Sequence, residues 1–208
     1  MIVDGKRIAV PGVSVTTWLD DPKRAPRVTD GATRKVPPCA VVLHTSRGVR
    51  GGVREGSRPS TLAETLALYQ ARTAREVSWH ITVDTDGDVL QQADASTWTC
   101  WHAGRANAWS VGIELVQSPD TGDLWRVQVD AAVRVVDALC AALQIPRRVP
   151  VAPSGRPVVG VVAGWVASST RWAGVIGHRH LTSDRGPGDP GDAIFDALLA
   201  AGFEGAQP

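Results

Sequence analysis

Short apolar runs alternate with amphipathic stretches along the chain, and together they predict an α/β fold. Apolar or alternating runs of strand length, bounded by Gly, Pro or Asp-Gly turns, lie at 40–44, 78–84, 88–92, 111–116 and 175–178. Apolar residues with helical spacing mark 61–75, 128–143 and 192–201. Because strands and helices do not alternate in strict order, we expect a mixed central β-sheet flanked by α-helices.

The first 37 residues show little periodicity and predict an N-terminal arm. Only 8–18 alternates well enough for a strand, whereas 20–35 is charged and rich in turn residues. A length of 208 residues suits one domain with an extended arm. We therefore expect residues 1–37 to pack as an arm on a single domain formed by residues 38–208.

Charge and composition exclude several classes of protein. Lys and Arg total 22 against 21 Asp and Glu, so the net charge of +1 indicates no nucleic-acid partner. The chain shows neither a signal peptide nor an apolar stretch long enough to span a membrane. Three cysteines without CxxC spacing (Cys39, Cys100 and Cys140) favour buried reduced thiols over disulfides. We expect a monomer without a membrane partner, cytoplasmic when synthesised.

Two histidines and an aspartate stand where strands end and could form a metal site. His44 ends the apolar run at 40–43, His178 follows the run at 175–177, and Asp189 lies in a Gly-Asp-Pro-Gly turn. Two imidazoles and one carboxylate suit Zn²⁺ and leave a fourth tetrahedral position for water. The site requires the two strands to be neighbours. His180 is an alternative ligand, although His178 continues the apolar strand directly.

Glu114 interrupts the buried apolar run at 111–116. An ionisable side chain in such a strand is rarely tolerated without a partner or a function. As a general base it could take a proton from water and deliver it to a leaving nitrogen. The alternative is a buried ion pair, with Arg179 or Arg185 as the partner.

Two other histidines allow different interpretations. His80 lies between Trp79 and Ile81 in a predicted strand, which favours a core histidine with its hydrogen bonds satisfied. His102 lies in the loop TCWHAG, and its turn context predicts an exposed side chain that contacts substrate.

A glycine-rich loop with four arginines follows His44. The arginines are Arg47, Arg50, Arg54 and Arg58. Such a loop is either a solvated surface or a basic rim that attracts an anionic substrate. On the second interpretation Arg47, close to the metal site in sequence, contacts the substrate.

Five motifs in order give the chain a family resemblance. The segments VVLHTS, SWHITVDTDGDVLQ, TCWHAG, SVGIELV and IGHRH…GDPG resemble the zinc-dependent N-acetylmuramoyl-L-alanine amidases of the amidase_2 type. That superfamily also includes the peptidoglycan recognition proteins, and the resemblance spans about residues 39–200. It implies a zinc site at the end of a peptidoglycan-binding cleft. The implied reaction is hydrolysis of the amide between N-acetylmuramic acid and L-alanine.

The resemblance assigns roles to individual residues. His44 and His178 match the zinc histidines, Asp189 matches the third ligand, and Glu114 matches the catalytic glutamate of the aspartate-ligand branch. The partner implied is peptidoglycan or a muropeptide, and the cofactor is Zn²⁺.

Two positions depart from the family pattern. Trp79 stands where the phage branch has a catalytic tyrosine, and an indole cannot perform proton chemistry, so we expect it to contact substrate. Pro187 stands where a lysine is common, two residues before the aspartate. Arg185, or alternatively Arg179, is the candidate that supplies the missing positive charge.

Three functions are compatible with these motifs. The first is the zinc amidase, and the second is a module of the same fold that binds muropeptides without cutting them. The third is a zinc hydrolase that cuts a different amide of the stem peptide. The biological setting is either a phage endolysin acting on the periplasmic cell wall or a cytosolic recycling enzyme.

Overall fold

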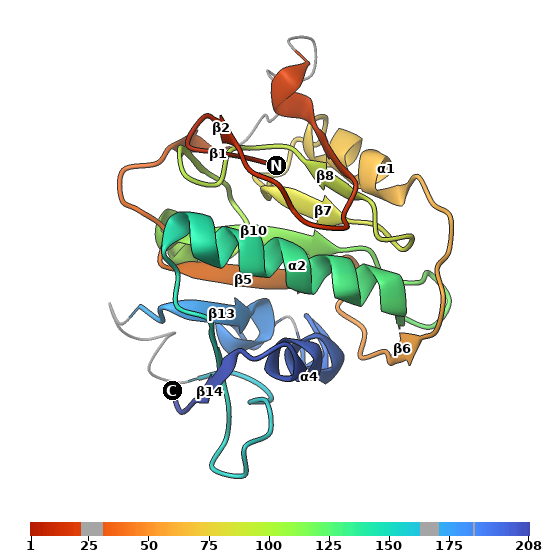
Figure 1. The fold of residues 1–208 in the computed structure, drawn as a ribbon, viewed down its shortest axis with the longest axis vertical. Coiled ribbons are helices and arrows are strands. Elements are labelled where there is room, and N and C mark those ends of the chain that lie inside the picture. Colours follow the sequence, from red (N-terminus) through yellow and green to blue (C-terminus); the bar gives the residue numbers. More distant parts are fainter. Residues whose placement is uncertain (22–30, 163–170, 185) are drawn as a thin grey trace.

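The computed structural model describes residues 1–21, 31–162, 171–184 and 186–208 and contains a six-stranded central sheet (Figure 1). The strands, in order across the sheet, are β13 (Gly174–Gly177), β5 (Ala40–Thr45), β10 (Ser110–Leu115), β7 (Ile81–Val83), β8 (Val89–Gln91) and β3 (Val15–Thr17). The pairs from β13 to β7 are parallel, β7 and β8 are antiparallel, and β8 and β3 are parallel. The predicted mixed sheet is therefore confirmed.

Alternation along the two central strands separates a structural face of the sheet from a functional face. Leu43 of β5 and Ile113 of β10 are fully buried in the main core with α2 (Arg126–Leu143). In Figure 1, α2 lies over β10 and β5 and runs along them. Successive side chains of a strand point to opposite faces. His44 and Glu114, the next residue in each strand, therefore point away from α2.

Two of the predicted helices match the structure closely. Helix α2 begins two residues before the predicted 128–143 and ends at the same residue, and α4 spans Asp192–Ala200. Ile194 and Leu198 of α4 are fully buried in the same core as α2. No helix in the described part of the chain is long and apolar enough to cross a membrane.

Helix α1 differs from the prediction in its length and in the face that it buries. It spans Leu62–Gln70, and its buried side chains are Ala63, Ala67 and Gln70. Leu62 and Tyr69 belong to the helically spaced apolar residues that predict the helix at 61–75, which leads us to expect them to face the core, but they are 37% and 44% exposed. The two alanines pack instead against a small cluster formed by Trp18 and Leu90. Small side chains let α1 approach the sheet closely, which hydrophobic periodicity alone does not reveal.

The N-terminal segment contributes a strand to the edge of the central sheet. The predicted strand at 8–18 is reduced to β3, and most of the charged stretch at 20–35 lies outside the described residues. The described residues also form four two-stranded sheets. Their strands are β1 (Ile2–Val3) with β2 (Lys6–Arg7), β4 (Ala32–Thr33) with β9 (Trp98–Thr99), β6 (Val53–Arg54) with β11 (Leu124–Trp125), and β12 (Arg148–Pro150) with β14 (Glu204–Ala206).

Three short 3₁₀ helices adjoin strands of the central sheet in the described part of the chain. They are η1 (Trp18–Asp20) after β3, η3 (Gly104–Trp109) before β10, and η4 (His178–His180) directly after β13. The last of these ends the strand at Gly177 and begins the segment that carries two of the candidate ligands.

Candidate functional site

The sheet order brings His44, His178 and Asp189 together. β5 and β13 are neighbouring parallel strands, so His44 near the end of β5 and His178 just after β13 lie at the same edge. Their ring centroids are 4.7 Å apart. All three residues are buried, and one candidate ligand atom from each lies within 4.8 Å of the others. This group can hold a metal ion.

Two contacts of the group test whether it suits a cation. Asp189 accepts a hydrogen bond through Oδ1 from the backbone N–H of Thr45, at 2.8 Å, so its carboxylate is held in place. Its Oδ2 lies 3.4 Å from Nδ1 of His178. That nitrogen is buried and has no hydrogen-bond partner in the described part of the chain. A buried polar atom without a partner is costly, and a metal ion would supply one. The donor set therefore fits Zn²⁺.

His180 is directed away from this group. Its Nδ1 accepts a hydrogen bond from the N–H of Gly177 at 3.0 Å, and its Nε2 lies 2.9 Å from the carbonyl oxygen of Val158 and 3.2 Å from Nε of Arg179. Burial, with the charge of Arg179 next in importance, lowers the pKa of His180 to about 3. The structure therefore places His178, not His180, with His44.

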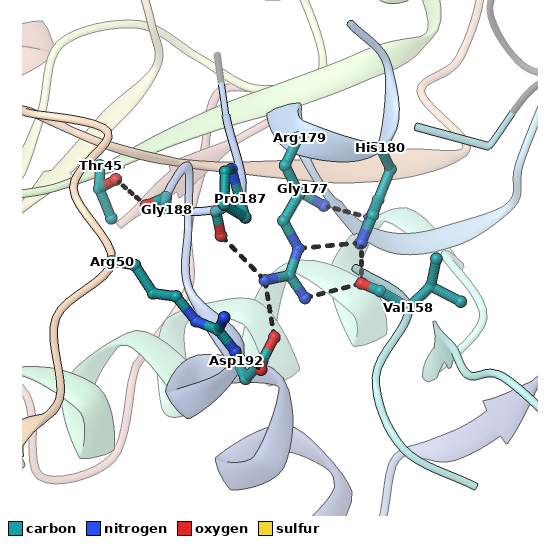
Figure 2. Close-up of polar contacts among 9 residues, drawn as sticks. All are labelled: Thr45, Arg50, Val158, Gly177, Arg179, His180, Pro187, Gly188 and Asp192. Atoms are coloured by element: carbon teal, nitrogen blue, oxygen red, sulfur yellow. Dashed lines mark hydrogen bonds and ion pairs between the residues drawn. The ribbon is translucent and has the colours of Figure 1, made fainter. Parts of the chain in front are cut away.

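Arg179 anchors the segment that carries Asp189 (Figure 2). Its backbone N–H donates to the carbonyl of Asp189 at 2.8 Å, and its guanidinium donates to the carbonyls of Pro187 and Val158. The same guanidinium forms an ion pair with Asp192 at 2.8 Å and is fully buried. The suggestion that Arg179 supplies a positive charge to the reaction is therefore wrong, because its donors are committed to the scaffold. Arg185 lies outside the described residues.

Close approach at Gly177 also shapes the site. A Cβ at this position would lie 2.7 Å from Cδ of Pro190 and 3.3 Å from the carbonyl oxygen of Asp189. The absence of a side chain lets the Asp189 segment pack against the end of β13.

Glu114 lies on the strand next to His44, in the same register. The Cα partners are Glu114 and His44 in parallel β10 and β5, and both side chains line one large cavity. Glu114 is half-buried, unlike its fully buried strand neighbours Ile113 and Leu115. Its exposure to the cavity and its proximity to the candidate ligands allow it to exchange protons there.

The prediction that His102 is exposed is wrong. Its side chain is 7% exposed, and its Nδ1 lies 3.0 Å from Nε2 of His44. Burial, followed by the charges of His80, His178 and Arg34, lowers the pKa of His102 well below its ordinary value. The loop carries the ring against that of His44, where it is buried but still lines the cavity.

His80 is a satisfied core histidine, as its sequence context predicts. It is completely buried, and its Nδ1 accepts from the N–H of Gly112 at 3.0 Å. Its Nε2 donates to the carbonyl of Trp98 at 3.0 Å. Burial, followed by the charge of Arg34, lowers the pKa of His80 to about 3.

The cavity in front of these residues has a volume of about 1460 Å³. Aromatic and charged side chains line it around the candidate ligands and Glu114, including those of Tyr69, Arg75, Trp79, Trp101, Arg105 and Arg171. A volume of this size accommodates a substrate larger than an ordinary small-molecule ligand. The indole N–H of Trp79 donates to Oγ1 of Thr82 at 2.7 Å, so it is engaged within the sheet.

The arginine loop lies outside the cavity. Within the described part of the chain, the residues that line the cavity include none of the loop's four arginines. Arg50 forms an ion pair with Asp192 at 2.8 Å, and Arg54 forms one with Asp123 at 2.6 Å. Arg47 is exposed, next to the cavity residue Ser46. These pairs tie the loop to the fold, and only the contact of Arg47 with substrate stays a prediction.

Comparison with known proteins decides the family. The model of the family Amidase_2, described as N-acetylmuramoyl-L-alanine amidase, matches residues 34–192. The chain belongs to the Amidase_2 family. This membership supports an amidase or peptidoglycan-binding role. No curated protein matches the chain by sequence.

Solved structures share the fold of this Amidase_2 chain at low sequence identity. One is the endolysin N-acetylmuramoyl-L-alanine amidase LysCS from Clostridium intestinale URNW, with a TM-score of 0.52 and 13% identity, covering 92% of this chain and 95% of that one. Drosophila PGRP-SA has a TM-score of 0.55 and 15% identity, covering 94% and 96%. A mutant of Drosophila PGRP-LB in complex with tracheal cytotoxin has a TM-score of 0.54 and 14% identity, covering 92% and 96%. These likenesses establish the fold.

Sequence reasoning missed two residues of this Amidase_2 site, Ser110 and Gly112. Both lie in β10 on the same face as Glu114, beneath the ring of His102. Their small side chains carry no chemical signal of their own. Only the alternation of β10 relative to Glu114 could have indicated which face they occupy.

Proposed function

We propose that this chain is a zinc-dependent N-acetylmuramoyl-L-alanine amidase, which cleaves the amide between the lactyl group of N-acetylmuramic acid and L-alanine. The observation that carries the proposal is the buried group His44, His178 and Asp189 beside Glu114 in one cavity. Family membership supports the reaction class, and the orphaned Nδ1 of His178 supports a metal.

His44, His178 and Asp189 would hold the Zn²⁺. When bound, Zn²⁺ supplies a Lewis acid that lowers the pKa of water toward 7 and polarises the scissile carbonyl. Thr45 keeps Asp189 oriented, and Arg179 fixes the backbone of the same segment.

Glu114 acts as the general base and then as the general acid. It accepts a proton from the attacking water and delivers that proton to the leaving nitrogen of L-alanine. A carboxylate that is half-buried and faces the cavity can exchange protons without leaving its strand.

Three further residues are proposed to contact the substrate or to supply charge. Trp79 is largely buried but lines the cavity, and its ring is the part that would contact the substrate, since its N–H is bound to Thr82. Arg47 attracts anionic peptidoglycan from outside the cavity, and Arg185 is the candidate that supplies the positive charge of the family lysine. The proposed setting is either an endolysin that acts on the periplasmic wall or a recycling enzyme.

Digestion of purified sacculi and of soluble muropeptides, with mass analysis of the products, tests the proposal. We expect stem peptides with a free L-alanine amino group and glycan with a free lactyl carboxylate. Neither product should form when a chelator is added. Cleavage at another amide would contradict the assigned bond. Binding to sacculi without cleavage by the zinc-loaded protein would instead identify a non-catalytic binding module.

A further inference from the structure

The ring of His102 is held in contact with that of His44. The N–H groups of His102 and Ala103 both donate to Oδ1 of Asn107, at 2.9 and 2.6 Å, which fixes the loop. The ring then lies edge-on to that of His44, with centroids 5.1 Å apart, and the nearest nitrogens are 3.0 Å apart. The contact is a hydrogen bond between two imidazoles, so one ring must donate and the other must accept.

Gly112 makes room for this arrangement. A Cβ at position 112 would lie 2.7 Å from Cγ and 2.8 Å from Nδ1 of His102. Contacts this short do not occur between a Cβ and other atoms, so any larger residue at position 112 would displace the ring of His102. The glycine therefore allows His102 to lie against the sheet.

Ser110 determines which imidazole donates. Its Oγ lies 2.6 Å from the carbonyl oxygen of Ala106, and two oxygens this close require the hydroxyl hydrogen between them. The same Oγ lies 3.4 Å from Nε2 of His102. Because its hydrogen is already used, Oγ can only accept, so Nε2 of His102 carries the proton. Nδ1 of His102 is then the acceptor, and Nε2 of His44 donates to it.

We infer that Ser110 and His102 hold His44 in the tautomer protonated on Nε2, so that Nδ1 carries the lone pair for the metal. His102 is thus a positioning residue for His44. Metal-bound histidines commonly donate their second ring nitrogen to an acceptor, which fixes the tautomer and the ring orientation. The inference rests on the proposed function in one respect: it names zinc as the ion to which Nδ1 of His44 donates its lone pair.

Nuclear magnetic resonance on the metal-free protein tests the tautomers directly. The chain has five histidines, so ¹⁵N-labelled imidazoles can be assigned by substituting each in turn. At neutral pH we expect protonated Nε2 and unprotonated Nδ1 in both His44 and His102. A proton on Nδ1 of either ring would overturn the inference. The spectrum requires no zinc and no activity.

Zinc affinity, measured by competition with a chromophoric chelator, tests the consequence. His102→Leu removes the acceptor and should weaken binding about 10- to 100-fold. His102→Asn offers an amide oxygen near the position of Nδ1 and should restore part of the loss. Zinc affinity of His102→Leu equal to that of wild type would overturn the positioning role. The same loss of zinc affinity in His102→Leu and His102→Asn would overturn it as well.

Ser110→Ala keeps both histidines and provides an independent measurement if His102→Leu fails to fold. Loss of the Oγ contact should shift His102 toward a mixture of tautomers and should weaken zinc binding by less than His102→Leu does. An unchanged ¹⁵N pattern in this variant would overturn the role of Ser110. If wild-type protein binds no zinc at all, the proposed function fails, and the tautomers in wild type still decide the inference.

Discussion

Glu114 and His44 are register partners on adjacent parallel strands, and both side chains line the same cavity. In a parallel pair, partners in register project from the same face of the sheet. This relationship places a carboxylate beside a candidate zinc ligand without any contribution from a mobile loop. A site built on strands holds its geometry more closely than one built on loops.

Glu114→Gln should lower kcat by a factor of about 10² to 10⁴, the usual contribution of one positioned proton-transfer group. The amide is nearly isosteric, so zinc content and affinity for sacculi should stay close to wild type. Turnover, zinc content and thermal unfolding measured on one preparation check this expectation.

The same measurements separate catalysis from a structural ion pair. The guanidinium of Arg179 is bound to Asp192, which leaves that residue unsuited to the suggested pair with Glu114. A Glu114→Gln variant that unfolds at a much lower temperature, yet retains most of its specific activity, would remove Glu114 from the mechanism.

His178→Ala should abolish tight zinc binding, since it removes one of three side-chain ligands. His180→Asn is the matched control, because an amide oxygen can accept the hydrogen bond from Gly177 that Nδ1 of His180 accepts. We expect this variant to retain one zinc per chain in metal analysis. Full zinc in His178→Ala together with loss in His180→Asn would reverse the choice of ligand.

Arg47→Gln should raise KM and weaken its salt dependence, with kcat nearly unchanged. An exposed charge contributes about 0.2–1 kcal/mol, which corresponds to at most about a five-fold change in KM. Arg54→Gln serves as the control, because Arg54 is paired with Asp123. Initial rates at several salt concentrations give the comparison, and identical salt profiles for wild type and Arg47→Gln would show that Arg47 is only a solvated surface residue.

Stability should fall as the pH is lowered from about 6.5 toward 3. Burial lowers the folded-state pKa of both His80 and His180 from 6.5 to about 3, so in this window the unfolded chain binds protons that the folded chain does not. Each such group makes the free energy of unfolding decrease by about 1.4 kcal/mol per pH unit. Denaturant unfolding at several pH values should give a shallower slope for His180→Asn than for wild type. Equal slopes would contradict a neutral, buried His180.

The sequence alone determined the central strands, two of the helices and the residue types of the candidate site. Apolar runs located the central strands, helical spacing located α2 and α4, and the family motifs gave the residue types of the site. These signals are local, because the period of a strand or a helix is set by a few neighbouring residues. The same locality explains why His44, His178 and Glu114 could be named as candidates before their positions in space were known.

Only the tertiary structure decided which side chains meet. His102 and His44 are 58 positions apart in sequence, and their contact depends on the order of the strands and on the space left by Gly112. The direction of Arg179 was likewise fixed by Asp192 on α4, and no spacing in the sequence encodes that contact. Local patterns do not distinguish which of several candidate side chains enter the site. Long-range packing decides this, because burial and hydrogen-bond satisfaction are properties of the assembled fold.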